Sequence, residues 1–415
     1  MEAWAQTRVD GPTVAGIPMD FILFGATLIG VALFHNRVLL VASSGLLVII
    51  LYNFLITGFK HGAGFGGLVA HFGHEWVILT NLFCLLVGFA LLADQFERSH
   101  VPELIPRLLP SGWKGGFALL TLIFVLSGFL DNIAAAIIGG TVAMSIYNRR
   151  VHIGYVAAIV AASNAGGAGS VVGDTTTTMM WIAGVNPLNV LPAYVAAIVA
   201  LVVFGIPASM QQARHADMIT SGTRRVQYDK ARVAIVFIIL ISAIVTNVTV
   251  NVKFTALADH FPFIGVAVWV ALLLTSRWRA PNWKLIPETA RGSLFLLALV
   301  TCASLMPVEK LPAASWQSSL SLGFISSIFD NIPLTALAIK QGGYDWAMLA
   351  YSVGFGGSMI WFGSSAGVAI ANIIPEAKSV GAWVKNGWHV PVGYVVGFLV
   401  MYALVGWHPT PLGVP

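Results

Sequence analysis

The chain has 415 residues, of which 57% are hydrophobic and 9% are charged, and its mean hydropathy is +0.84. Soluble domains carry roughly 25% charged residues, so this composition excludes a soluble globular protein and indicates an all-α polytopic membrane protein. The formal charge of +5 is typical of basic cytoplasmic loops, and we expect the lipid bilayer, not nucleic acid, as a partner.

Residues 1–18 are predicted to form an external N-terminal segment. They contain acids, glycine and proline and lack a basic start followed by an apolar core, so no signal peptide is evident. The first apolar helix is therefore expected to direct insertion into the membrane.

Apolar segments fill most of the remaining chain. They cover residues 19–34, 38–56, 76–93, 115–147, 154–183, 191–210, 232–252, 262–276, 293–306, 320–339, 346–374 and 390–406. A membrane-spanning helix needs about 20 residues, and most of these segments fit that length. The segments that begin at residues 115, 154, 320 and 346 differ, because polar or glycine-rich clusters interrupt them.

The interruptions form two similar pairs. SGFLDNIAAAII (127–138) matches SSIFDNIPLTAL (326–337) in its serine, aspartate and asparagine, and NAGGAGSVVGDT (164–175) matches GFGGSMIWFGSS (354–365) at three glycines. This pattern indicates an internal duplication. Interrupted helices at corresponding places in two halves are the best sequence indication of a transporter's substrate site.

We interpret each Asp-Asn segment as a re-entrant helical hairpin and each glycine-rich segment as a broken crossing helix. Each repeat then has five crossings, one of them broken, plus one hairpin, and the odd number of crossings predicts two repeats of inverted topology. The expected parts are a first repeat at 19–210 (hairpin about 115–147, broken helix about 154–183), a basic cytoplasmic linker at 211–231, and a second repeat at 232–415 (hairpin about 319–340, broken helix about 346–374).

Charge predicts the orientation. Placing the linker in the cytoplasm puts most lysines and arginines inside, including Arg149 and Arg150, as the positive-inside bias requires. The basic residues left outside are Arg8, Lys60, Lys253, Lys310 and Lys340. Both termini are then external, and we expect a multi-pass protein of the inner (plasma) membrane, with a bacterial internal membrane as an alternative.

The hairpin tips and helix breaks carry the polar side chains that a site inside the membrane needs. The candidate ion- or substrate-binding residues are Asp131, Asn132, Asn164, Asp174, Thr175, Thr176, Thr177, Ser326, Asp330, Asn331, Ser364 and Ser365. Within this set the candidates for a Na⁺ site are Asp131, Asn132, Asp174, Thr176, Asp330 and Asn331. Carboxylate, amide and hydroxyl oxygens without lysine or arginine suit Na⁺, Li⁺ or H⁺, and one carboxylate can bind either a cation or a proton.

Several of these residues have an alternative, structural role. Asp131 and Asp330 can cap a buried helix, and Asp174 can cap the second half-helix through Thr176 or Thr177. The motif HFGHE (71–75) is expected in a glycine-rich external loop. The acidic residues expected on solvated cytoplasmic faces are Asp94, Glu97, Glu288 and Glu376.

The sequence gives no indication of an enzyme. It contains no Walker, Rossmann or nucleophile-elbow pattern, so neither ATP-driven pumping nor hydrolysis is predicted, and we expect no cofactor. Cys84 and Cys302 lie in separate apolar segments and indicate packing, not a disulfide or a thiolate metal site.

The two motif pairs, extended to SNAGGAGSVVGDTTTTMMWIAG and GFGGSMIWFGSSAGVAIAN, resemble NhaD-type Na⁺/H⁺ antiporters of the ion transporter superfamily. That superfamily also contains arsenite carriers, divalent-anion/sodium symporters and citrate carriers. The resemblance covers residues 115–183 and 320–372 and implies two inverted repeats, commonly in a homodimer with a scaffold domain and a moving transport domain. It places the family's functional positions on Asp131, Asn132, Asn164, Asp174, Thr176, Thr177, Ser326 and Asn331.

We therefore expect a secondary transporter that exchanges Na⁺ or Li⁺ for H⁺ by alternating access. Two alternatives stay open: a cation-coupled carrier of citrate, another organic anion or an oxyanion, and a non-transporting membrane assembly protein on the same scaffold, because one fold can serve several functions. Carboxylates at both tips argue against an anion, since they repel it unless a cation or proton accompanies it.

Overall fold

A computed structural model describes residues 11–34, 37–60, 62–101, 109–219, 227–254, 257 and 260–412. Helices dominate these residues, and the strands among them are the short antiparallel pair β1 (Thr13–Val14) and β2 (Ile17–Pro18). Five of the described helices are long and apolar enough to cross a membrane, or six if the bent pair α17 and α18 is one span. The predicted all-α polytopic membrane protein is confirmed at this level. Parts of the predicted N-terminal segment and linker lie outside the described residues.

The first half of the chain contains long helices and a set of shorter ones. Its elements are α1 (Met19–Leu33), α2 (Val38–Tyr52), the π-helix η2 (Asn53–Thr57), α3 (Gly64–Glu97), α4 (Trp113–Ser127), α5 (Asn132–Ile146), α6 (Ile153–Gly167), α7 (Thr175–Ile182), the 3₁₀ turn η4 (Pro187–Asn189) and α8 (Ala193–His215). At 1.5 Å per residue, α4 and α5 are each about 22 Å long, shorter than a bilayer core of roughly 30 Å.

The second half also combines longer helices with shorter ones. They are α9 (Lys230–Lys253), α11 (Phe263–Thr275), the 3₁₀ turn η5 (Trp283–Leu285), α12 (Ile286–Ser304), η6 (Val308–Lys310), α13 (Trp316–Ser326), α14 (Asn331–Gln341), α15 (Trp346–Gly356), α16 (Ser365–Ile373), η7 (Pro375–Lys378), α17 (Val380–Asn386) and α18 (His389–Val405). The helix axes of α17 and α18 differ by 57°, a bend that the apolar pattern did not predict.

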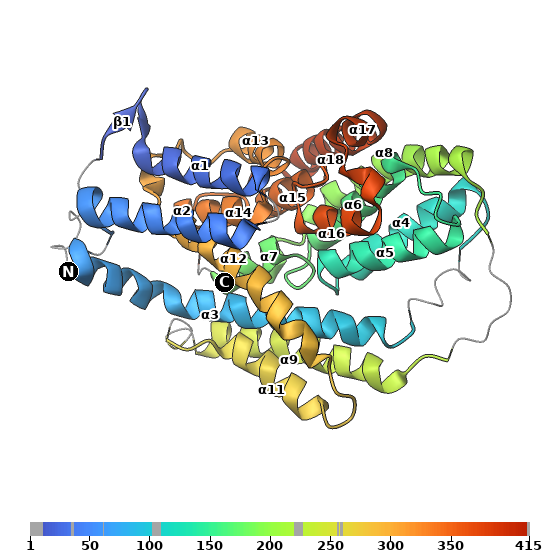
Figure 1. Cartoon of the computed structure of the whole chain (residues 1–415), viewed down its shortest axis with the longest axis horizontal. Helices are drawn as coiled ribbons and strands as arrows, with labels where there is room; N and C mark the ends of the chain where they lie inside the picture. Colours follow the sequence, from blue (N-terminus) through green and yellow to red (C-terminus); the bar gives the residue numbers. More distant parts are fainter. Residues whose placement is uncertain are drawn as a thin grey trace.

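The helices of the two halves interlock. α3, α9 and α11 pack together along the lower edge of Figure 1, and α8 packs along α18. The second helix of each interrupted pair reaches into the other half: α5 packs against α16, and α14 packs against α7. The predicted hairpin tips are thereby held beside the helix breaks of the opposite half.

Contacts at matched positions repeat within each half. Ser127 Oγ donates a hydrogen bond to the carbonyl oxygen of Ser163 at 2.5 Å, and Ser326 Oγ donates one to the carbonyl oxygen of Val353 at 2.7 Å. These pairs occupy corresponding positions in the two aligned motifs. The internal duplication seen in the sequence therefore extends to three-dimensional contacts.

In each half, one glycine lets two helices approach closely. A Cβ placed on Gly166 would lie 2.0 Å from the carbonyl oxygen of Phe124, and one on Gly356 would lie 2.2 Å from that of Gly323. Any side chain at either position would therefore displace a backbone. These glycines occur at corresponding places in the repeated motif and serve the packing of α4 on α6 and of α13 on α15.

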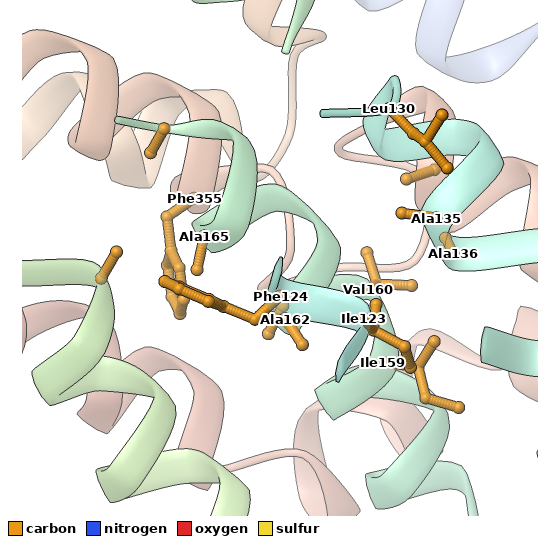
Figure 2. Close-up of a cluster of buried hydrophobic side chains, with 14 of the residues drawn as sticks. Ile123, Phe124, Leu130, Ala135, Ala136, Ile159, Val160, Ala162, Ala165 and Phe355 are labelled. Carbon is orange, nitrogen blue, oxygen red and sulfur yellow. The ribbon is translucent and has the colours of Figure 1, made fainter. Parts of the chain in front are cut away.

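Apolar side chains fill the space below the first tip. Figure 2 shows Ile123 and Phe124 of α4 beside Ile159 and Val160 of α6, with Phe355 of α15 close by. The small residues of α6, mostly alanine, valine and glycine, are fully buried, so neighbouring helices can approach them on every side. This packed core gives the polar tips a rigid base.

One local prediction was wrong. The motif HFGHE was expected in an external loop, but it lies inside α3, which starts at Gly64. His71 is buried and its Nε2 lies 3.0 Å from Ser304 Oγ of α12, while Glu75 forms an ion pair with Lys340 of α14. Glycine-rich sequence can remain helical when tertiary contacts cover it, and here these contacts outweigh the low helix propensity.

Candidate functional site

The two Asp-Asn tips meet at one cavity. Asp131 is the N-cap residue of α5 and Asp330 is the N-cap residue of α14, so each carboxylate lies where a pair of short helices turns. Both aspartates and the asparagines that follow them, Asn132 and Asn331, line a cavity of about 710 Å³. Thr175 and Ser365, the first residues of α7 and α16, line the same cavity. The structure thus brings together six of the predicted residues.

The two tip carboxylates have different surroundings. Asp330 caps α14 by accepting a hydrogen bond from the backbone N–H of Ile332 at 3.0 Å, and Ser365 Oγ donates to its second oxygen at 3.3 Å. The Asp131 side chain makes no capping hydrogen bond. The capping alternative therefore fits Asp330, whereas Asp131 is the less constrained carboxylate of the two.

Behind the cavity lies a buried polar network that joins the two halves. Asn132 Nδ2 donates to Asn164 Oδ1 at 3.0 Å and to Asp174 Oδ1 at 3.3 Å. Asn164 Nδ2 in turn donates to Ser358 Oγ at 2.9 Å and to Ser364 Oγ at 3.1 Å. Asn164 has no exposed surface. One amide therefore links the first tip to the broken helix of the second half.

Asp174 combines a capping role with an unused oxygen. Its Oδ1 accepts a hydrogen bond from the backbone N–H of Thr176 at 3.2 Å, which confirms the predicted cap on α7. The residue is only 1% exposed, yet its Oδ2 has no hydrogen-bond partner among the described residues, and neither has Thr176 Oγ1. Buried polar atoms are normally paired, so two orphan oxygens from one helix start are candidate ligands for an ion, although neither residue lines the cavity.

The other threonines and Ser326 use their hydroxyls on the backbone. Thr177 Oγ1 donates to the carbonyl oxygen of Ser170 at 2.5 Å, and Thr178 Oγ1 donates to that of Val171 at 3.0 Å. Ser326 bonds Val353, and neither Ser326 nor Thr177 lines the cavity. In this conformation the two threonine hydroxyls hold the irregular chain between α6 and α7, which lies deep in protein and needs such partners.

The electrostatics of the cavity favour a cation. No lysine or arginine lines it in the described part of the chain, whereas Asp94 and Glu97 of α3 and Glu288 of α12 do. From the sequence these acids were expected on solvated faces of helices, because nothing in the sequence shows that the end of α3 lies near the start of α12. The described residues hold no cluster of three His, Cys, Asp or Glu side chains, so mixed carboxylate, amide and hydroxyl oxygens are the donors available to an ion.

One residue beside the site was missed by the sequence analysis. Gly354 faces the Asp174 carboxylate: a Cβ placed on it would lie 2.7 Å from Asp174 Oδ2. Gly354 is the residue that aligns with Asn164 in the repeated motif. The sequence could have pointed to Gly354, because the two matched positions, 164 and 354, carry different residues.

The known proteins that resemble this chain are named as sodium/proton antiporters, in agreement with a cavity that favours a cation. No family model matches the chain. The chain is 27% identical over 330 residues to Sodium/proton antiporter 1 of Arabidopsis thaliana, a match that covers 68% of the chain and 52% of that protein. It is 27% identical over 329 residues to Sodium/proton antiporter 2 of the same plant, covering 68% and 72%. It is 24% identical over 355 residues to the Na⁺/H⁺ antiporter NhaD of Vibrio parahaemolyticus, covering 70% and 81%.

The predicted resemblance to NhaD-type antiporters is confirmed. The match spans about half the length of the first plant relative and most of the length of the bacterial ones. The names of these relatives describe ion exchangers and not enzymes, in agreement with the absence of catalytic motifs from the sequence.

Proposed function

We propose that this protein is a secondary antiporter that exchanges Na⁺ for H⁺, with Li⁺ as an alternative cation. The observation that carries the proposal is a cavity at which two tip carboxylates meet and which no basic side chain lines among the described residues. An anion would be repelled there, whereas a partly dehydrated cation finds carboxylate, amide and hydroxyl oxygens. The printed names of the relatives support the same exchange.

The site has two layers that suit a stepwise exchange. Asp131 lines the cavity, and Asp174 lies behind it, linked by the Asn132 side chain. A cation that enters the cavity meets Asp131 first and can then reach Asp174, displacing a proton from each carboxylate that it binds. The proton returns when the cation leaves, so the same oxygens serve both ions in turn.

Unequal packing of the two halves supports alternating access. α12 packs along α14, whereas the matching helices α3 and α5 pack much less closely, and side chains of α3 and α5 line the cavity between them. In two repeats of inverted topology, exchanging these two arrangements would close one side and open the other. The re-entrant hairpins, α4 with α5 and α13 with α14, would move with their tips.

The proposal also covers the orientation of the protein in the membrane and its assembly. The cavity reaches Asp94, Glu97 and Glu288, which lie beside the basic loops expected in the cytoplasm, so this conformation would face inward. A plasma-membrane location, external termini and the homodimer that the resemblance implies remain predictions of the same scheme.

Transport in proteoliposomes tests the proposal. Purified protein is reconstituted with a pH-sensitive dye inside, and Na⁺, Li⁺, K⁺ or citrate is added outside. Proton movement on addition of Na⁺ or Li⁺, but not K⁺, is the expected result. Uptake of labelled citrate without such proton movement would support an anion carrier instead, and no transport by protein with an intact melting transition would support an assembly role.

A further inference from the structure

The space beside Asp174 is shaped by a residue from the other half of the chain. Gly354 is buried in the last turn of α15, and α15 packs against α7, whose N-cap is Asp174. A Cβ built on Gly354 would lie 2.7 Å from Asp174 Oδ2 and 3.9 Å from its Cγ. Outside its own helix, no other heavy atom of the described residues comes within 4 Å of that position. The space that a side chain at residue 354 would occupy therefore borders the Asp174 carboxylate.

This glycine has no evident role in helix packing. Gly356 lies two residues further along α15. A Cβ placed on Gly356 would lie 2.2 Å from the carbonyl oxygen of Gly323, so the helix packing requires glycine there. Gly354 meets only the end of one side chain. A glycine in a helix costs about 1 kcal/mol relative to alanine, and among the described residues outside α15 a Cβ here would crowd the Asp174 carboxylate alone, so this glycine accommodates that carboxylate.

The matched residue of the first half fills the corresponding place. Asn164 aligns with Gly354 in the repeated motif, and its amide occupies the polar network. An asparagine or even an alanine at residue 354 would intrude on the orphan oxygen of Asp174. The chain thus has one large polar residue and one glycine at equivalent positions around a single buried carboxylate.

We infer that Gly354 determines which cation fits beside Asp174, by keeping open the space next to Asp174 Oδ2. This inference rests on the proposed Na⁺/H⁺ exchange and adds a residue that selects among monovalent cations by size. Selectivity between hard cations depends on cavity size and ligand number, and a methyl group added at this position would narrow the space without removing any ligand.

Three variants test the inference in proteoliposomes. Gly354→Ala narrows the space, and Asp174→Glu narrows it from the other side by carrying the carboxylate one methylene further. Gly381→Ala is the control, because Gly381 of α17 does not line the cavity and a Cβ there meets nothing within 4 Å. The apparent KM values for Na⁺ and for the smaller Li⁺ are measured from the proton flux, and thermal melting checks folding.

For Gly354→Ala we expect the apparent KM for Na⁺ to rise about tenfold, and that for Li⁺ less than about threefold, with the control unchanged. Equal KM changes for both ions, or none, in a folded Gly354→Ala protein would overturn the inference. If that variant does not fold, Asp174→Glu decides by the same Na⁺-to-Li⁺ ratio. A wild-type protein without any Na⁺- or Li⁺-driven proton flux would instead overturn the proposed function.

Discussion

The two halves of this chain share their backbone contacts and differ in their chemistry. Each half has an Asp-Asn tip, a serine that bonds the next helix, and a glycine at a close helix approach. At the second break, however, Ser364 stands where the first half has Asp174, and Gly354 stands where it has Asn164. The duplication thus supplies a symmetric framework, and the buried carboxylate behind the cavity belongs to the first half alone.

In the proposed exchange, this difference would let one cavity serve two ions. A framework with equal halves can exchange one packing arrangement for the other at little cost, since both use the same contacts. In the proposed exchange the buried Asp174 is the one centre, because Asn132 bonds it and also bonds Asn164, which reaches the second half through Ser358 and Ser364.

Replacing Asp174 by asparagine should abolish exchange. Asn also caps helices, so α7 should keep its start, while the charge that binds the cation is lost. We expect the Na⁺-driven proton flux to fall at least about 100-fold, equivalent to roughly 3 kcal/mol, because a charged ligand in a dry site is lost. Ser364→Ala is the control from the other half, and it should lower the flux less than about fivefold. Equal losses in the two variants would contradict the assignment of the chemistry to the first half.

The two tips should also differ, though by less. Asp131→Asn removes the carboxylate that makes no capping bond, and we expect about a tenfold higher KM for Na⁺. Asp330→Asn keeps a cap on Ile332, and its KM should rise only about two- to threefold. Proton-flux measurements over a range of Na⁺ concentrations give both values. A larger effect at Asp330 than at Asp131 would reverse the order proposed for the tips.

The ion pair between Glu75 of α3 and Lys340 of α14 should hold one side closed. Glu75 lies about 28 Å along α3 from Asp94, at 1.5 Å per residue, and therefore far from the acidic side of the cavity. Glu75→Gln should weaken closure by about 1 kcal/mol, a roughly fivefold shift between the two arrangements. A cysteine introduced at Ile332 in a protein without native cysteines reports this shift through its reaction rate with an impermeant external maleimide.

The charge-swapped double variant Glu75→Lys/Lys340→Glu is the control for this pair. Its labelling rate should return toward that of the parent protein, because the ion pair is restored in reverse. Unchanged labelling in Glu75→Gln would mean that the pair contributes nothing to closure.

The smallest effects should come from the framework serines. Ser127→Ala and Ser326→Ala each remove one buried hydrogen bond to a carbonyl and leave that carbonyl unpaired. We expect each to destabilise the protein by about 1–2 kcal/mol and to lower the melting midpoint by a few degrees at most. The two losses should be similar, and KM for Na⁺ should not change. A selective loss of Na⁺ affinity in Ser326→Ala would instead make Ser326 a ligand.

The sequence predicted the interrupted helices because polar residues inside apolar runs are rare and need a reason. Asp131 and Asp330 were found in this way, and so was the cap formed by Asp174. The continuation of α3 through HFGHE was missed, since tertiary contacts with α12 and α14 decide it. The bond from Asn164 to Ser364 joins residues 200 apart, and no local pattern encodes such a contact. Gly354 was overlooked for a similar reason: what matters there is the carboxylate of another helix.

Proton release on Na⁺ binding tests the central claim most directly. Purified protein in detergent and weak buffer is titrated with Na⁺ while pH is recorded, so that neither a membrane nor a gradient is involved. If cation and proton compete for the same carboxylates, Na⁺ should release protons from the wild type and far fewer from Asp174→Asn. Na⁺ binding without proton release, or equal release from the wild type and Asp174→Asn, would contradict the account.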